Sequence, residues 1–328
     1  MSELRQDPVS GDWMINAPER AKRPHDFLPK RKKRKSTPKS RCPFEDLKRS
    51  GNWPPIVLVT NKNEDDWRAV IIPNKYPALM HKRSCATTSY RGPYKLLSGI
   101  GHHDVLVSRD HNKNIAHLNL RDGMAIFRAL QKRYKMLIAD SCMVYASAFM
   151  NWGEGAGASL HHPHFQILTL PITPPDVEHS LRGSQDYFRK NNKCVHCEMI
   201  GDEVKSKKRV ILKNKYAVAV APFVSRQPFE VRIYPLRHRP YFERVKDGEL
   251  ESIVDLLQRT LLRVEKKLND PDINFFIHTA PVQYQNRYKH YHWHIEILPK
   301  ITVQAGFEKG TGVDINVIDP NKAAELLR

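Results

Sequence analysis

Apolar residues recur at helical spacing in two long segments of the chain, 121–139 and 247–268. In each segment most spacings between them are three or four residues, or add up to three or four, which predicts an amphipathic helix with one face packed on a core. In the first segment they are Met124, Ile126, Phe127, Leu130, Tyr134 and Leu137, and in the second Leu250, Ile253, Leu256, Leu257, Leu261 and Val264.

Short apolar runs typical of strands surround both predicted helices. In the first half they lie at 56–60, 69–73 and 104–108 before the helix and at 143–151 and 162–170 after it. In the second half they lie at 217–222, 229–235, 273–280 and 290–299. The repeated order predicts an α+β fold of two duplicated units, each an antiparallel sheet with a packed helix. We place the units at residues 1–185 and 186–328.

Histidine positions support the duplication. His111 precedes His162 by 51 residues, and His238 precedes His292 by 54. In each half a cysteine lies upstream, the predicted helix lies between the two histidines, and a His-x-His strand closes the unit. A chance match of order and spacing is the alternative to divergent duplication.

The segment 151–170, NWGEGAGASLHHPHFQILTL, is the richest in chemistry. On a strand, His162, His164 and Gln166 would project from the same face. The preceding glycines permit positive φ and close approach of a ligand, and their N–H groups with the Ser159 hydroxyl suit phosphate oxygens. A neutral imidazole can attack phosphorus, and a neighbouring amide can donate to the phosphoryl oxygens. The alternative is a structural zinc site among core histidines.

Net charge changes the picture little. The chain carries 54 Lys and Arg against 35 Asp and Glu, a net charge of +19, but residues 20–41 alone contribute eleven cations and one acid. We interpret the basic tract 30–41 as an exposed linker, with a nucleic-acid patch or phosphate steering as alternatives. The apolar runs are too short for a membrane span and no signal region opens the chain, so we expect a cytoplasmic protein.

Cysteine usage favours metal binding over a disulfide scaffold. The chain has five cysteines and 16 histidines, and Cys194 and Cys197 form a C-x-x-C. Such a pair in a reducing compartment suits zinc, with a redox pair as the alternative. Cys85 and Cys142 carry no partner signature and are expected to be buried and unpaired.

Seven motifs in order resemble the galactose-1-phosphate uridylyltransferase family of the histidine-triad superfamily, over nearly the whole chain. They are Asp7-Pro-Val-Ser-Gly-Asp-Trp13, Arg20-Ala-Lys-Arg-Pro24, Cys42-Pro-Phe, Asn74-Lys-Tyr-Pro-Ala-Leu79, Ser108-Arg-Asp-His111, the stretch 151–166, and His292-Trp-His-Ile-Glu296 followed by Ala305-Gly-Phe-Glu308.

The resemblance implies roles by position. His164 would be the catalytic nucleophile that takes up the nucleoside monophosphate, and Gln166 would contact the transferring phosphoryl group. The substrate-binding set would be Arg20, Arg23, Asn74, Asn151, Gly157, Ser159, Gly306, Phe307 and Glu308. The arginines would approach the nucleotide phosphates, and 306–308 would lie near the sugar phosphate.

The resemblance also implies one zinc site, and the repeat adds a second. The family pattern falls on Cys42, Glu45, His111 and His162, where Glu45 replaces the expected second cysteine; zinc accepts a carboxylate oxygen. Cys194, Cys197, His238 and His292 occupy the corresponding places in the second half. His196, His278 and His294 remain possible substitutes there, as does His103 in the first site. The family uses no organic cofactor.

Only the first unit is expected to be active. Where it offers Gln166, the second offers Glu296, and a carboxylate repels a phosphoryl group that an amide would bind. The resemblance then implies transfer of UMP between UDP-glucose and galactose 1-phosphate, through a nucleotidyl-histidine, in galactose metabolism. The alternatives are an adenylyl-transferring relative, such as an ADP-glucose or dinucleotide phosphorylase, and a nucleic-acid-binding protein of the same superfamily. Expected partners are a nucleoside-diphosphate sugar and a sugar 1-phosphate, with neither membrane nor nucleic acid; the family precedent implies a homodimer.

Overall fold

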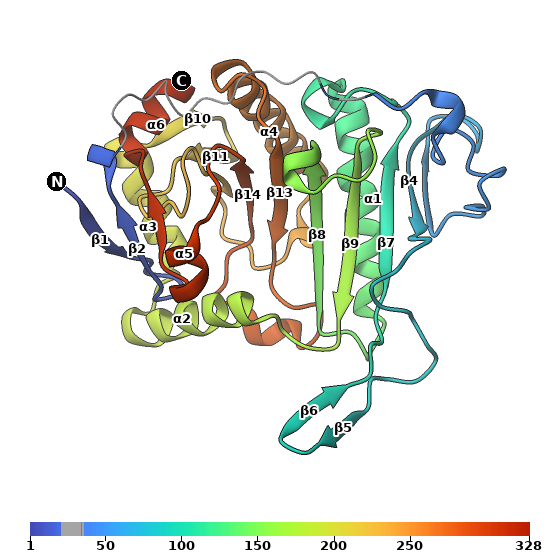
Figure 1. The fold of residues 1–328 in the computed structure, drawn as a ribbon, viewed down its shortest axis with the longest axis horizontal. Helices are drawn as coiled ribbons and strands as arrows, with labels where there is room; N and C mark the ends of the chain where they lie inside the picture. Colours follow the sequence, from blue (N-terminus) through green and yellow to red (C-terminus); the bar gives the residue numbers. More distant parts are fainter. Residues whose placement is uncertain (21–33, 35) are drawn as a thin grey trace.

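A continuous antiparallel sheet runs through the molecule (Figure 1). The computed structural model describes residues 1–20, 34 and 36–328. Outward from the middle in one direction the strands are β8 (Tyr145–Trp152), β9 (His164–Leu170), β7 (His103–Ser108), β4 (Trp67–Pro73) and β3 (Val57–Thr60). In the other direction they are β13 (Ile273–His278), β14 (His294–Pro299), β12 (Val231–Pro235), β11 (Ala217–Val220) and β10 (Val210–Lys213).

Strands β8 and β13 join the two arms of the sheet. They pair with Phe149 opposite Phe276. Gln166 lies opposite Phe149 on one side, and Glu296 lies opposite Phe276 on the other. The two residues that distinguish the predicted active and inactive units therefore occupy equivalent places in one row across the sheet. The predicted domain boundary at 185/186 falls within a helix and stays a prediction.

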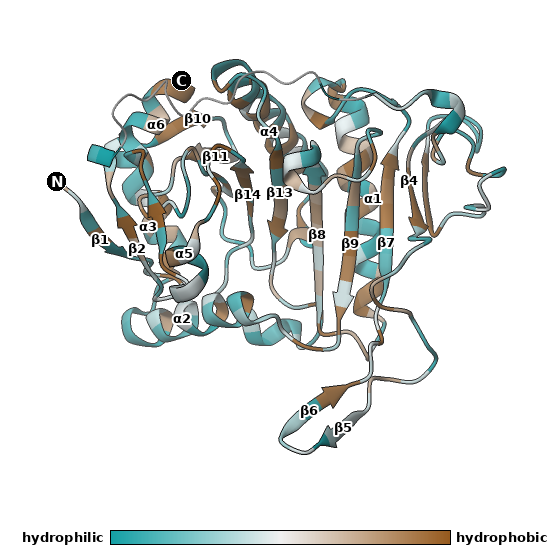
Figure 2. Cartoon of the chain, viewed as in Figure 1, coloured by the Kyte–Doolittle hydropathy of each residue, from teal (hydrophilic) through white to brown (hydrophobic). Residues whose placement is uncertain are grey.

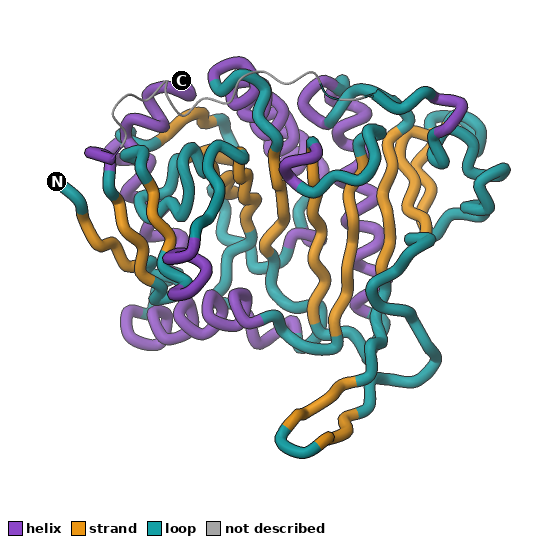
Figure 3. Tube along the Cα trace, viewed as in Figure 1, coloured by secondary structure: helices purple, strands orange, loops and turns teal. Residues whose placement is uncertain are grey.

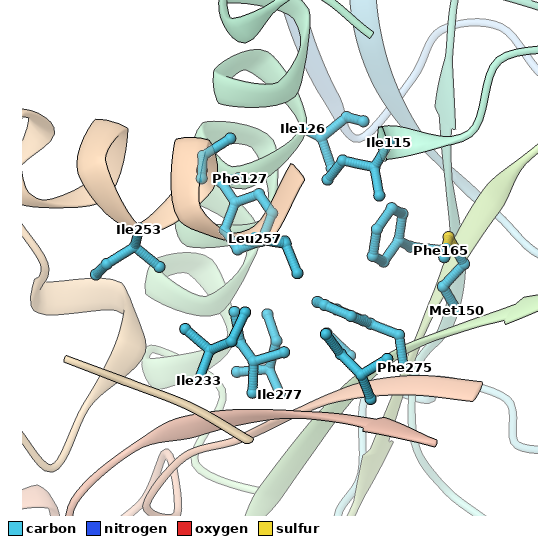
Figure 4. Packing of buried hydrophobic residues seen from close by; sticks show 14 of the residues in the cluster. Ile115, Ile126, Phe127, Met150, Phe165, Ile233, Ile253, Leu257, Phe275 and Ile277 are labelled. Atoms are coloured by element: carbon cyan, nitrogen blue, oxygen red, sulfur yellow. The ribbon is translucent and has the colours of Figure 1, made fainter. Parts of the chain in front are cut away.

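Two long helices cover one face of the sheet, as the apolar periodicity predicts. They are α1 (Leu120–Ile138) and α4 (Asp247–Lys267), each within one residue of the predicted bounds. The Asn119 side chain caps α1 by accepting from the Asp122 N–H at 2.9 Å. The apolar stripe of α1 and α4 meets Phe165, Phe275 and neighbouring sheet residues in one buried cluster (Figure 4). Hydropathy follows this division, with apolar residues concentrated on the strands and the inner helix faces (Figure 2).

The remaining elements surround this core, and several were missed at the sequence level. A small sheet consists of β1 (Glu3–Gln6), β2 (Trp13–Asn16) and β15 (Asp314–Asn316), and a hairpin of β5 (Thr88–Arg91) and β6 (Tyr94–Leu97) projects away from the main body (Figure 3). The other helices are α2 (Pro175–Asn191), α3 (Val195–Ser206), α5 (Gly306–Thr311) and α6 (Pro320–Leu327). Short 3-10 turns occur at η1 (Pro18–Arg20), η3 (Lys39–Arg41), η4 (Ile115–His117), η5 (Glu154–Ala156), η6 (Phe242–Arg244) and η7 (Gln285–Tyr288). No helix within the described ranges is long and apolar enough to cross a membrane.

Two expectations about local structure were wrong. Cys85 and Cys142 form a disulfide, although their separation of 57 residues gave no pairing signal. Arg34 is not part of a freely solvated tract: its guanidinium pairs with Asp270 and lies 4.9 Å from the centre of the Trp152 ring. The rest of the basic tract up to residue 33, and residue 35, lie outside the described residues.

Candidate functional site

His164 opens strand β9 and has the tautomer a nucleophile requires. The residue is 7% exposed, and its Nδ1 lies 2.9 Å from the carbonyl oxygen of His162. Because a carbonyl can only accept, Nδ1 carries the proton and Nε2 keeps its lone pair. Burial lowers the pKa of His164, more than its hydrogen bond to that carbonyl raises it, which favours the neutral ring. His162 itself precedes the strand, so the two histidines are held differently.

Gln166 is oriented by His103, whose role the sequence did not reveal. The Ala78 N–H donates to His103 Nδ1 at 3.0 Å, so His103 Nε2 carries the proton. That Nε2 lies 2.9 Å from Gln166 Oε1 and therefore donates to it. The amide NH2 of Gln166 is thereby left available as a donor. Asn74 Nδ2 lies 3.1 Å from the same His103 nitrogen, which places Asn74 beside the pair.

The loop between β8 and β9 depends on glycine and on Asp272. Gly153 has φ +90°, and a Cβ there would lie 1.8 Å from Asp272 Oδ1. The Gly155 N–H donates to Asp272 Oδ2 at 2.7 Å. Gly157 also has a positive φ of 86°. The Asp272 carboxylate therefore holds the loop in a conformation that a side chain at Gly153 or Gly155 would prevent.

Asn151 and Ser159 lie at the two ends of this loop. Asn274, on the neighbouring strand β13, donates to Asn151 Oδ1 at 2.9 Å and to the Ala156 carbonyl at 2.8 Å. This amide bridge ties the end of β8 to the loop. Ser159 is exposed at the other end.

A cavity of about 720 Å³ brings together several predicted substrate-binding residues. The predicted residues Arg20, Phe307 and Glu308 line it, together with Gly155 and Phe276, which were not predicted. Within the described chain, His164 and Gln166 do not line this cavity; Gln166 lies two strands from Phe276, about 10 Å at ordinary strand spacing. Arg23 lies outside the described residues.

The residues of the first predicted metal set converge. Possible ligand atoms of Cys42, Glu45, His111 and His162 all lie within 4.8 Å of one another. Cys42 Sγ is 3.4 Å from His162 Nδ1, and tetrahedral zinc would separate sulfur and nitrogen ligands by about 3.6 Å. His111 Nε2 and His162 Nε2 donate to the carbonyls of Thr37 and Ser108 at 2.7 and 2.8 Å. Both Nδ1 atoms are then free to bind a cation, so the set fits zinc.

The second predicted metal set converges in the same way. Ligand atoms of Cys194, Cys197, His238 and His292 lie within 4.8 Å. Cys197 Sγ is 3.4 Å from His238 Nδ1 and 3.5 Å from His292 Nδ1, again near the tetrahedral separation. Hydrogen bonding from the Cys197 thiol, then from His238 and His292, lowers the pKa of Cys194 despite burial, which favours a thiolate. The donors fit zinc without the substitutes His196, His278 or His294.

Glu296 sits in a charged environment unlike that of Gln166. Arg226 Nη2 and Arg232 Nε lie 2.7 and 3.1 Å from its carboxylate oxygens. Burial acts to raise the pKa of Glu296, but Arg232 and then Arg226 outweigh it and hold the pKa well below its ordinary value. The second unit therefore presents an anion where the first presents an amide.

Comparisons with known proteins find relatives that match nearly the whole chain. A family model described as a domain of unknown function, DUF4921, matches residues 79–327. ADP-glucose phosphorylase of Arabidopsis thaliana is 35% identical over 99% of this chain and 92% of its own. A crystal structure of an ADP-glucose phosphorylase from the same plant, with bound ADP-glucose, superposes with a TM-score of 0.84 at 33% identity, covering 100% of this chain and 99% of that one. Galactose-1-phosphate uridylyltransferase of Thermotoga maritima is 26% identical over 100% of this chain and 98% of its own.

Proposed function

Because the chain belongs to the DUF4921 family of galactose-1-phosphate uridylyltransferase-like nucleotidyltransferases, we propose that it transfers a nucleoside monophosphate through a covalent bond to His164. The observation that carries the proposal is the His164 tautomer. Nδ1 is committed to the His162 carbonyl at 2.9 Å, and Nε2 has no hydrogen-bond partner among the described residues. The nucleophilic atom is therefore defined before substrate binds.

The reaction divides into two displacements at phosphorus. In the first, His164 Nε2 attacks the α-phosphorus of a nucleoside-diphosphate sugar, and the sugar 1-phosphate leaves with the electron pair of the broken P–O bond. The ring then carries a positive charge, which the His162 carbonyl stabilises at Nδ1–H. In the second, an acceptor phosphate oxygen attacks the same phosphorus and the P–N bond breaks. The amide of Gln166, aimed by His103, donates to the phosphoryl oxygens in both steps.

We propose ADP-glucose as the nucleotide sugar and inorganic phosphate as the acceptor, giving ADP and glucose 1-phosphate. Identity of 35% to an ADP-glucose phosphorylase, against 26% to the Thermotoga uridylyltransferase, supports this choice. It is the alternative that the sequence left open, in place of the uridylyl specificity that the resemblance first implied.

Transfer of UMP between UDP-glucose and galactose 1-phosphate is the second candidate. It is supported by the same Thermotoga relative, which matches 98% of its own length. Both candidates use the same chemistry at His164 and differ in the base recognised and in the acceptor.

Zinc has a structural part in this proposal. Bound to Cys42, Glu45, His111 and His162, it would hold the chain just before β9 by joining these four ligands. It would not contact or polarise the substrate. His162 belongs to this set, and its carbonyl accepts the proton of His164. These residues thereby hold the nucleophile's backbone partner in place.

Intact-mass spectrometry tests the proposal. The protein is incubated separately with ADP-glucose and UDP-glucose, quenched without acid, and examined for added AMP or UMP. We expect AMP on the wild-type chain and none on His164→Asn. His294→Asn is the matched control, because His294 opens β14, is 3% exposed and likewise bonds through Nδ1 to the residue 292 carbonyl. Labelling of His164→Asn would refute the nucleophile, and labelling by UMP alone would favour the second candidate.

A further inference from the structure

A third group of ligand-type side chains lies away from the site described above. His81, in the segment before β5, His102, just before β7, and Asp140, after α1, place possible ligand atoms within 4.8 Å of one another. We propose that His81, His102 and Asp140 bind a zinc ion, which fastens the base of the β5–β6 hairpin to the body of the protein.

The distances suit a divalent ion. Asp140 Oδ2 lies 2.9 Å from His102 Nε2 and 3.6 Å from His81 Nδ1. Around tetrahedral zinc, nitrogen and oxygen ligands lie about 3.4 Å apart, so the three atoms are already near that spacing. One nitrogen of each ring faces the same carboxylate oxygen. The imidazoles stack with centroids 4.2 Å apart and planes 15° apart, and because an imidazole binds an ion in the plane of its ring, the exposed His81 ring would tilt away from His102 on binding.

The carboxylate is held in place by its other contacts. Asp140 Oδ1 accepts from the Cys142 N–H at 3.0 Å, which leaves Oδ2 to the histidines. The Asp140 carbonyl accepts from Gln283 at 2.8 Å. Outer contacts of this sort orient a ligand before the metal arrives.

A disulfide near the three side chains links two of the segments that carry them, and the exposed face of the cluster gives an ion access from solvent. The Cys85–Cys142 disulfide joins the same two segments that carry His81 and Asp140, so these ligands remain near each other without the ion. The His81 side chain is 47% exposed, which gives an ion a path from solvent and leaves room for a water ligand. The nearby Arg133 is paired with Asp104 at 2.7 Å, which offsets its charge.

The ion would affect the reaction only indirectly, by fixing the position of His102. His102 adjoins His103, which donates to Gln166, and the His102 N–H is anchored on Thr169 Oγ1 at 2.6 Å. Fixing His102 therefore steadies the segment that aims the Gln166 amide. In this proposal His81, His102 and Asp140 are structural ligands and touch no substrate.

Counting metal ions tests the site. Wild-type protein and the variants Asp140→Asn, His81→Gln and His117→Gln are saturated with zinc and analysed by native mass spectrometry. We expect Asp140→Asn and His81→Gln each to hold one ion fewer than wild type. His117→Gln should match wild type, because His117 is similarly exposed, at 42%, and pairs with one carboxylate, Glu265, outside the cluster.

Cobalt substitution separates this site from the two cysteine-containing sets. A site of two histidines and an aspartate adds visible cobalt absorption without a thiolate-to-cobalt band in the near ultraviolet. In Cys42→Ser/Cys197→Ser protein Glu45, His111 and His162 remain as a second set without a thiolate, so we expect adding His81→Gln to remove one cobalt equivalent of this absorption. His81 is exposed, so its replacement does not endanger folding. Equal zinc counts in wild type and His81→Gln, or unchanged cobalt absorption when His81→Gln is added, would show a hydrogen-bonded cluster only and overturn the proposal.

Discussion

Replacing Gly153 by alanine tests whether the Asp272 carboxylate shapes the loop before β9. At φ +90° and ψ 156° Gly153 lies in a region that essentially only glycine adopts, where an L side chain is strained by about 2 kcal/mol. The added Cβ would also lie 1.8 Å from Asp272 Oδ1, so the carboxylate must move and release the Gly155 N–H that it accepts at 2.7 Å. A hydrogen bond to a charged group contributes about 1.5 kcal/mol at the lower end of its range, appropriate here because Asp272 is 28% exposed.

The expected loss for Gly153→Ala is therefore about 3.5 kcal/mol in the free energy of unfolding. Gly157→Ala is the matched control. Its φ is nearly the same, +86°, but its ψ of 18° places it in the left-handed helical region, and the nearest atom to a new Cβ is Asn151 Nδ2 at 3.7 Å. This control should lose only the strain, about 1.5 kcal/mol.

Denaturant unfolding of both variants gives the two free energies, and turnover of ADP-glucose shows how far the loop is displaced. We expect Gly153→Ala to be the less stable of the two and to have the lower kcat/KM. Equal losses of stability, within about 0.5 kcal/mol, would mean that Asp272 does not constrain the loop. The reasoning about this carboxylate would then fail, while the φ argument would stand.

Three further predictions concern catalysis, metal and core. His103→Leu should lower kcat about tenfold with little change in KM, because the Gln166 amide loses its orientation, whereas Gln166→Ala should lower kcat about 100-fold. Steady-state kinetics measures both, and a larger loss of kcat for His103→Leu would contradict its indirect role. Cys197→Ser should lose one zinc ion by native mass spectrometry and lower the thermal midpoint, and an unchanged zinc count would exclude the second metal set. Leu257→Ala, at a fully buried position, should cost about 2 to 5 kcal/mol of unfolding free energy, while Leu262→Ala, 40% exposed on the same helix, should cost far less; equal losses would contradict the packing shown in Figure 4.

Patterns with a physical period could be predicted well. Helices α1 and α4 each bury one continuous stripe, so their periodicity survives in the sequence. Helix α2 was missed because few of its residues are apolar; it buries only Val177, Leu181 and Ser184. So few apolar positions do not distinguish the segment from a polar loop.

Contacts that depend on chain reversal could not be predicted. The first metal set could be predicted from the family resemblance, and the second because the repeat relates Cys42 and His162 to counterparts in the second half. The Ala78–His103–Gln166 relay needs the β4–β5 segment to fold back on β7, and no residue spacing encodes that. The metal roles, the homodimer and the domain boundary stay predictions.

The pairing of β8 with β13 has a consequence for any attempt to divide the molecule. Five register pairs join these strands, from Ile273–Trp152 to Ile277–Ala148. A fragment that contained only one of these two strands would leave its edge unpaired. The free amide and carbonyl groups along that edge are the usual template for aggregation. Each fragment carries the strand that pairs with the exposed edge of the other. Two co-expressed fragments should therefore reassemble through the β8–β13 pairing, whereas either fragment alone should precipitate.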